Sequence, residues 1–221
     1  MTLDRIRLIA AREARAERGQ PDGIVSAATF VATLILVESL AVGPLAASQP
    51  AVASALFWIA MAFAAILATS RSFERELEDD AIDAVLALPG GRDALYAGKA
   101  VALTALMALV AVAGGALSLL LLSLDIALPG HLAIVTVAGV LALPPVVVLF
   151  VVLALRLRSR GALVPILVLP VLVPQLVAAT NGTAAAMSGD MAGAFGWAGL
   201  LVAFALVYSV LGLTIVATAL E

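Results

Sequence analysis

Very few side chains in this sequence could do chemistry inside an apolar environment. Glu38 is the only carboxylate within a long apolar run, where such a group can carry protons or ions. A proton relay needs more members, so we interpret Glu38 as reaching toward the near end of its helix or bonding to a neighbouring helix. His131 is the single histidine, beside Pro129 and Gly130, and one imidazole makes no metal site.

Catalytic, cofactor-binding and metal-binding sites are therefore not predicted in this chain. The absence of cysteine removes disulfides, thiolate metal sites and covalent haem attachment. The sequence has no GxxxxGK[ST] phosphate loop, no HExxH and no GxSxG. Met187 and Met191 are four residues apart and could present two thioethers, but packing is the better interpretation. The residues indicate a protein that is not itself an enzyme.

The segment from Ser70 to Gly91 is the most informative for function, and it is strongly acidic. Its apolar residues follow steps of four and three, which predicts one stripe of a helix lying flat at the membrane interface: Phe73, Leu77, Ala81, Ala84 and Leu88. The other face carries Arg75, Glu76, Asp79, Asp80 and Asp83, with Ile82 and Leu86 among them. Helices that only bind lipid favour basic faces, because inner-leaflet lipids are anionic. The acidic face therefore predicts a docking surface for a protein.

Prolines interrupt two of the apolar runs. Pro144-Pro145 lies in one run, and Pro165, Pro170 and Pro174 lie in the next. Each proline removes a backbone donor and leaves a carbonyl that a neighbouring helix, or a polar group such as Gln175, must satisfy. The consequence is either a permanent bend or a hinge, and the last three prolines are the hinge candidates.

Long apolar helices must position these residues, because the composition is that of a membrane protein. Of 221 residues, 64% are hydrophobic and 12% are charged, and the mean hydropathy is +1.18. Each apolar run can cross about 30 Å of hydrocarbon, where backbone groups must bond within their own segment. We predict an all-α, polytopic protein with six transmembrane helices and an amphipathic cytoplasmic helix between the second and third. The spans are expected at about 24–42, 51–70, 100–124, 132–155, 161–180 and 196–220.

The basic residues set the expected orientation. All twelve fall within residues 5–18, 71–99 and 156–160, whereas segments 43–50, 125–131 and 181–195 carry no Lys or Arg. With six spans these three groups share one side, which the positive-inside rule places in the cytoplasm together with both termini. Residues 1–23 are then a cytoplasmic amphipathic segment, and residues 24–220 are a transmembrane domain that includes the cytoplasmic loop 71–99. The first run is span-length, so we expect it to be retained and not cleaved as a signal peptide.

Two groups of residues carry a family resemblance. Phe73-Glu74-Arg75-Glu76, followed by Ala84-Val85-Leu86-Ala87-Leu88-Pro89, resembles the loop between spans two and three of ABC-2 type transporter permeases. Three further segments resemble the CcmB family of cytochrome c maturation permeases, the haem exporter B proteins: Leu155-Arg156-Leu157-Arg158-Ser159-Arg160-Gly161, Ile166-Leu167-Val168-Leu169-Pro170 and Val173-Pro174. The similarity covers essentially the whole chain, and the loop and the fifth span are its specific parts.

The resemblance implies a permease subunit of an ABC transporter complex in the bacterial inner membrane. In the family this loop couples to a separate ATPase, which implies a coupling helix and coupling roles for Arg71, Phe73, Glu74, Arg75, Glu76, Asp79, Ile82, Asp83, Leu86, Leu88 and Pro89. The implied partners are the ATPase CcmA, the membrane proteins CcmC and CcmD, the haem chaperone CcmE and a second permease copy, in a lipid bilayer and without nucleic acid. ATP would bind to the ATPase partner. Haem would be handled by the complex, which exports it or releases the haem-loaded chaperone.

Other classes of membrane protein remain open at this point. A permease of another ABC-2 exporter, for drugs, lipids or polysaccharides, differs only in its substrate. An ion-coupled secondary transporter or channel would need intramembrane charge or inverted repeats, and the sequence shows neither. A non-catalytic scaffold is a third alternative. A cytoplasmic ATPase that co-purifies with the protein would decide between these classes.

Overall fold

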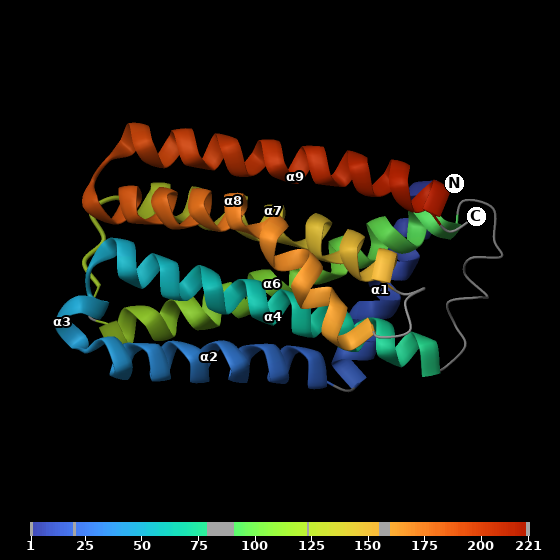
Figure 1. The fold of residues 1–221 in the computed structure, drawn as a ribbon, viewed down its shortest axis with the longest axis horizontal. Coiled ribbons are helices and arrows are strands. Elements are labelled where there is room, and N and C mark those ends of the chain that lie inside the picture. Colours follow the sequence, from blue (N-terminus) through green and yellow to red (C-terminus); the bar gives the residue numbers. More distant parts are fainter. Residues whose placement is uncertain (1, 20, 79–90, 123, 155–159, 220–221) are drawn as a thin grey trace.

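The computed structural model describes residues 2–19, 21–78, 91–122, 124–154 and 160–219. These residues form α1 (Thr2–Gly19), α2 (Asp22–Val42), α3 (Pro44–Ala47), α4 (Pro50–Glu78), α6 (Gly91–Leu122), α7 (Pro129–Ala154), α8 (Arg160–Ser188) and α9 (Met191–Ala219) (Figure 1). Within these ranges no β-strand occurs. Six of the helices contain a stretch long and apolar enough to cross a membrane: Gly23–Val42, Pro50–Glu74, Asp93–Leu122, Pro129–Ala154, Pro165–Ser188 and Met191–Val216. The prediction of an all-α, multi-pass membrane protein is confirmed.

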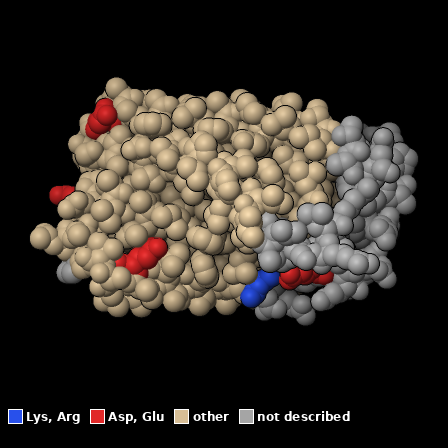
Figure 2. Space-filling model, viewed as in Figure 1, with Lys and Arg blue, Asp and Glu red and all other residues tan. Residues whose placement is uncertain are grey.

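The long helices lie side by side in a bundle with two different ends (Figure 1). The N- and C-termini lie at one end, here called the terminal end, together with α1, the last turn of α4 and the first turn of α6. The other end, here called the α3 end, holds α3 and the connections from α6 to α7 and from α8 to α9. The face seen in Figure 2 shows few charged side chains between these ends, as the hydrocarbon of a bilayer requires.

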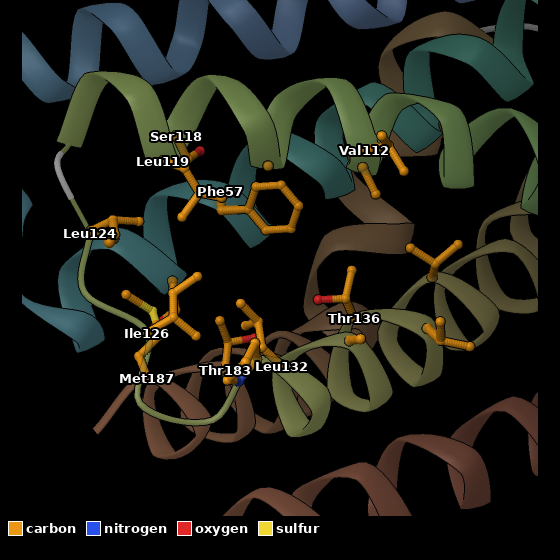
Figure 3. Close-up of a pocket in the computed structure, with 18 of the residues that line it drawn as sticks. Phe57, Val112, Ser118, Leu119, Leu124, Ile126, Leu132, Thr136, Thr183 and Met187 are labelled. Carbon is orange, nitrogen blue, oxygen red and sulfur yellow. The ribbon is translucent and has the colours of Figure 1, made fainter. Parts of the chain in front are cut away.

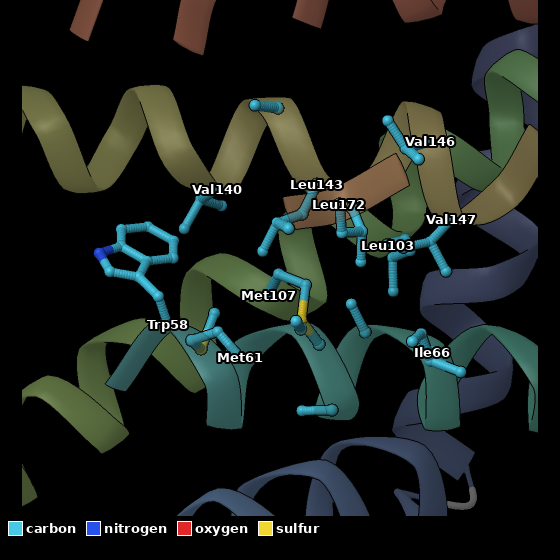
Figure 4. Packing of buried hydrophobic residues seen from close by; sticks show 14 of the residues in the cluster. Trp58, Met61, Ile66, Leu103, Met107, Val140, Leu143, Val146, Val147 and Leu172 are labelled. Atoms are coloured by element: carbon cyan, nitrogen blue, oxygen red, sulfur yellow. The ribbon is translucent and has the colours of Figure 1, made fainter. Parts of the chain in front are cut away.

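The core lies between α4, α6, α7 and α8. In α7, 78% of the most apolar window is buried inside the protein, against 17% in α2 and in α9. Figure 4 shows Trp58 and Met61 of α4 facing Val140 and Leu143 of α7. Alanines 60, 62, 64 and 65 of α4 are also buried. Small side chains such as these allow membrane helices to approach closely and gain dispersion energy, since lipid is as apolar as the side chains themselves.

Two glycines mark the closest helix contacts in the described bundle. A Cβ atom added at Gly139 of α7 would lie 2.2 Å from Cη2 of Trp58, and one at Gly212 of α9 would lie 1.9 Å from Cζ of Tyr96. The Trp58 side chain is fully buried, and its Nε1 donates a hydrogen bond of 2.9 Å to Oγ1 of Thr183. Both aromatic rings therefore occupy space that only glycine leaves free.

The fifth span is longer at its α3 end than the sequence indicated. We expected it to end near residue 180, followed by a loop at 181–195, whereas α8 continues to Ser188. Polar and small residues in this extra part are accommodated by neighbours, since Thr183 accepts the bond from Trp58 and Gly182 lies against Val135 and Trp197. The connection to α9 is a tight turn at Gly189, whose φ is +89°, a value that favours glycine.

The prolines lie inside continuous helices. Pro144 and Pro145 are buried within α7, and α8 runs through Pro165, Pro170 and Pro174. Figure 1 shows α8 changing direction partway along its length. Buried Gln175 of α8 donates from Nε2 to the Ala142 carbonyl of α7 at 3.2 Å, in the turn before the α7 prolines. Whether the prolines act as hinges stays a prediction.

Candidate functional site

The structure places part of the predicted coupling segment in α4. Arg71 and Glu74 are exposed, Phe73 is buried, and the backbones of Arg75 and Glu76 belong to the same helix. Residues 70–78 thus continue the second span as one helix, where we had expected a separate helix to begin. The remaining predicted residues, Asp79, Ile82, Asp83, Leu86, Leu88 and Pro89, lie outside the described residues.

A buried lysine lies where α4, α6 and α1 meet at the terminal end. Lys99 of α6 is only 3% exposed, and its Nζ donates to Oε1 of Glu13 at 2.9 Å and to Oγ of Ser72 at 2.6 Å. Ser72 in turn donates from Oγ to Oε2 of Glu13 at 2.8 Å. The ammonium also lies 4.8 Å from the centroid of the Phe73 ring, which is cation–π geometry. We call Glu13, Ser72, Phe73 and Lys99 the Glu13 junction.

The electrostatics of the junction favour the charged state of Glu13. Burial alone would raise the pKa of the Glu13 carboxyl, but the charge and hydrogen bond of Lys99, helped by Ser72 and Arg12, hold this pKa below its ordinary value of 4.5. A carboxyl whose pKa is lowered on folding contributes stability above its unfolded pKa, and this contribution is lost as the pH falls through the folded pKa. The junction is therefore fully formed at neutral pH and weakens only in acid below about pH 4.5.

The N-terminal helix is also tied to α2. Oε2 of Glu17 accepts a hydrogen bond of 3.1 Å from the backbone N–H of Ile24 in the first turn of α2. Arg71 of α4 donates from Nη1 to Oγ of Ser26, also in α2. With the Glu13 junction, these bonds connect α1 and α2 to the helix that ends at Glu78 and the helix that begins at Gly91. Both helices that bracket residues 79–90 are thus held by the same network of bonds.

Tyr96 connects the same turn of α6 to the opposite side of the bundle. Its side chain is 2% exposed, and its hydroxyl oxygen lies 3.1 Å from the carbonyl oxygen of Pro145 in α7 and 2.9 Å from that of Tyr208 in α9. The close approach at Gly212 fixes the ring between α6 and α9. The first three turns of α6 therefore contact α1 through Lys99, and α7 and α9 through Tyr96.

A cavity of about 360 Å³ lies beside the Glu13 junction, and Glu13, Ser72, Lys99, Leu103 and Leu106 are among its lining residues. Among the described residues, no group of three or more His, Asp or Glu side chains is placed to hold a metal ion. The arrangement of the junction suits mechanical connection, because its charges are matched and neutralised within the protein.

The other residues considered from the sequence lie apart from this network. Glu38 is on the α3 side of α2, and its Oε2 is buried without a hydrogen-bond partner. His131 makes an edge contact with the Phe195 ring at 4.8 Å between centroids. Met187 is buried whereas Met191 is 52% exposed, so their thioethers do not share one environment.

Sequence reasoning missed the four residues that join the helices at this site: Glu13, Ser72, Tyr96 and Lys99. A signal existed for Lys99, which directly precedes a long apolar run and so needs a partner if it is buried. The partner is 86 residues away in the sequence, and no local pattern identifies it.

Comparison with known proteins adds an independent observation. A family model described as CcmB protein matches residues 5–221. The chain is 28% identical over 169 residues to heme exporter protein B of Bradyrhizobium diazoefficiens, covering 76% of each protein. It is also 28% identical over 206 residues to heme exporter protein B of Pseudomonas aeruginosa, covering 90% of each.

Proposed function

Because the chain belongs to the CcmB protein family, we propose that it is the membrane-spanning permease subunit of a haem-exporting ABC transporter, as the names of its relatives suggest. In this proposal the complex serves cytochrome c maturation in the bacterial inner membrane. A separate ATPase subunit, CcmA, hydrolyses ATP, and the energy drives haem export or the release of the haem-loaded chaperone CcmE. CcmC, CcmD and a second permease copy complete the complex.

The Glu13 junction is the observation that carries the coupling part of the proposal. An ATPase that binds residues 79–90 would act on the last turn of α4 and the first turn of α6. Ser72 lies six residues before the end of α4 and Lys99 eight residues after the start of α6, and both are bonded to Glu13 of α1. A displacement of the loop is then shared by α1, α4 and α6, and Tyr96 passes it on to α7 and α9.

The proposed contact with the ATPase is tested by removing Ile82 and Leu86, the apolar residues predicted on the charged face of the segment. Replacing both with alanine should weaken ATPase binding at least about 30-fold, since even one apolar anchor at the centre of an interface carries about 2 kcal/mol or more. Retention of the ATPase on the tagged permease in mild detergent measures the effect.

The matched control is Leu206→Ala with Val210→Ala, which removes two apolar side chains, also four residues apart, from an exposed face of α9. The control variant should retain as much ATPase as the wild type and should be inserted into the membrane in the same amount. If the variant with alanine at Ile82 and Leu86 retains as much ATPase as the wild type, this pair is not the binding site for the ATPase. Failure of any ATPase to co-purify with the unaltered protein would favour ion-coupled transport or a scaffold instead.

The proposed orientation is tested by introducing single cysteines. Labelling of each is specific, because the chain has no cysteine of its own. Cysteine at Ser48 or Ser188, both near the α3 end, should react with a membrane-impermeant reagent added to intact spheroplasts. Ser188 is chosen over Gly189 because a φ of +89° would strain any other residue there. Cysteine at Ser159 should react only after the membrane is opened, and labelling from outside would reverse the proposed topology.

A further inference from the structure

A lateral groove of about 540 Å³ lies between α6 and α7 toward the α3 end (Figure 3). Phe57 of α4 forms part of its base, and Thr183 and Met187 of α8 lie at its far side. Figure 3 shows Val112 and Leu119 of α6 and Leu132 and Thr136 of α7 directed into the space between the two helices. The groove is separate from the Glu13 junction, with which it shares no lining residue.

The sequence makes this groove by placing small residues on facing helix surfaces. Ala108, Ala111 and Gly115 follow one face of α6, and Ala133 lies opposite in α7. A Cβ atom at Gly115 would meet no other atom within 4 Å. Side chains this small leave the space between the helices unfilled, although both helices are packed together nearer the terminal end through Leu103, Met107 and Val147 (Figure 4).

The mouth of the groove faces the bilayer. Val112, Val137 and Leu141 line the groove and are at least 45% exposed. All three belong to helices that are long and apolar enough to cross the membrane. In the bilayer such exposed side chains meet lipid, so whatever fills the groove enters from the hydrocarbon region.

Four of the five hydroxyl groups that line the groove are bonded within the protein, and the fifth, that of Thr136, is directed into the space (Figure 3). Ser54 Oγ donates to the Pro50 carbonyl at 2.6 Å, Thr104 Oγ1 to the Ala100 carbonyl at 2.8 Å, and Ser118 Oγ to the Gly114 carbonyl at 2.9 Å. Thr183 Oγ1 accepts the hydrogen bond from Trp58. None of the lining residues is charged. A ligand with carboxylates, such as haem, would leave them without a partner, at a cost of several kcal/mol.

We propose that this groove holds one acyl chain of a membrane phospholipid. An unbranched, flexible hydrocarbon chain matches walls that are uncharged and mostly apolar, and the volume lies within the range of about 300–1,000 Å³ that ligand pockets have. Dispersion drives the binding. Side chains that face an empty groove lose their van der Waals contacts on that side, and an acyl chain in the groove restores these contacts. The bound chain holds the α3-end halves of α6 and α7 at a fixed separation. This assignment does not depend on the proposed transport function.

Trp58 provides the optical probe for a test. The chain has two tryptophans, Trp58 and Trp197, so Trp197→Phe leaves Trp58 alone. Trp58 is fully buried, hence shielded from bulk lipid, but its indole nitrogen contacts Thr183 at the side of the groove. We expect its emission to fall when the full chain is placed in bilayers of phosphatidylcholine brominated at mid-chain, compared with the unbrominated lipid.

The groove is then closed by Gly115→Leu in the Trp197→Phe background. The added side chain fills the space, so the bromine quenching of Trp58 should be lost. Gly196→Leu is the matched control, because a Cβ there also meets no atom within 4 Å but Gly196 lies outside the groove, and quenching should persist. Ala108→Leu, two turns away on the same face, replaces Gly115→Leu if that variant inserts poorly.

A second readout counts lipid directly. Native mass spectrometry of the protein released from mild detergent should show one retained phospholipid, present in Gly196→Leu and absent in Gly115→Leu. Equal quenching and equal lipid retention in both variants would overturn the proposal. So would a haem absorption band that appears on addition of haem and is lost in Gly115→Leu. Quenching that is absent in the purified complex would assign the groove to a helix of a partner subunit and equally overturn the proposal.

Discussion

Replacing Lys99 with methionine is expected to destabilise the protein by about 3–5 kcal/mol, the typical cost of leaving one member of a buried ion pair without its partner. Glu13 would then have lost its hydrogen-bonded ammonium, and the cation–π contact with Phe73 would be lost as well. Thermal unfolding in detergent and the yield of monodisperse protein measure the loss. An unfolding temperature equal to that of the wild type would contradict the importance of the Glu13 junction.

Removing both charges separates a structural role of the junction from a role in coupling. Lys99→Met with Glu13→Leu removes both charges of this ion pair together, so stability should recover most of the loss of the single variant. The apolar pair no longer fixes a register between α1 and α6, because it lacks the directional bonds to Ser72. We therefore expect a stable complex whose ATP hydrolysis responds less to the permease. Normal ATP turnover in this double variant would show that the junction only stabilises the fold.

The second large effect is expected from Gly139→Ala in the centre of α7. The new methyl group would lie 2.2 Å from Cη2 of Trp58, a ring that is fully buried and held by its bond to Thr183. Overpacking of a core costs about 1–3 kcal/mol, and we expect the upper value here because the ring is fully buried and any shift strains its hydrogen bond to Thr183. The unfolding temperature and the amount of inserted protein should both fall.

Two further variants make this result specific. Gly199→Ala on α9 adds the same methyl group where nothing lies within 4 Å, and it should be neutral or stabilising by up to about 1 kcal/mol. Trp58→Phe removes the ring atoms that the Gly139 methyl group would meet, so the combined variant should be more stable than the sum of the single effects. Additive losses would mean that Gly139→Ala acts through some contact other than Trp58.

The six spans could be predicted because the bilayer imposes a length and a composition that each segment satisfies alone. The exact ends of the helices depend on contacts between segments. Asn181 and Gly182 are residue types typical of loops. In the structure Asn181 donates from Nδ2 to the Val177 carbonyl at 2.9 Å, and Gly182 provides the space that Trp197 and Val135 require. Such residues extend α8 by about two turns beyond the apolar run.

The candidate site was predicted less completely than the fold. The sequence pointed to the segment after Ser70, because its acidic and apolar residues alternate with the period of a helix. It did not show that α4 continues straight through Phe73 to Glu78, nor that the nearby charge at Lys99 turns inward to Glu13. Periodicity describes one helix at a time, and an ion pair between α1 and α6 depends on how the bundle assembles.

The hydroxyl of Tyr96 carries a single hydrogen but lies within bonding distance of two carbonyl oxygens, those of Pro145 and Tyr208. It can serve only one of them at full strength. If one of the two distances lengthens slightly, the hydrogen can turn to the other carbonyl, so the buried donor keeps an acceptor. A small relative displacement of the two helices therefore does not leave the buried hydroxyl without an acceptor, so it avoids the penalty that an orphaned polar group would impose.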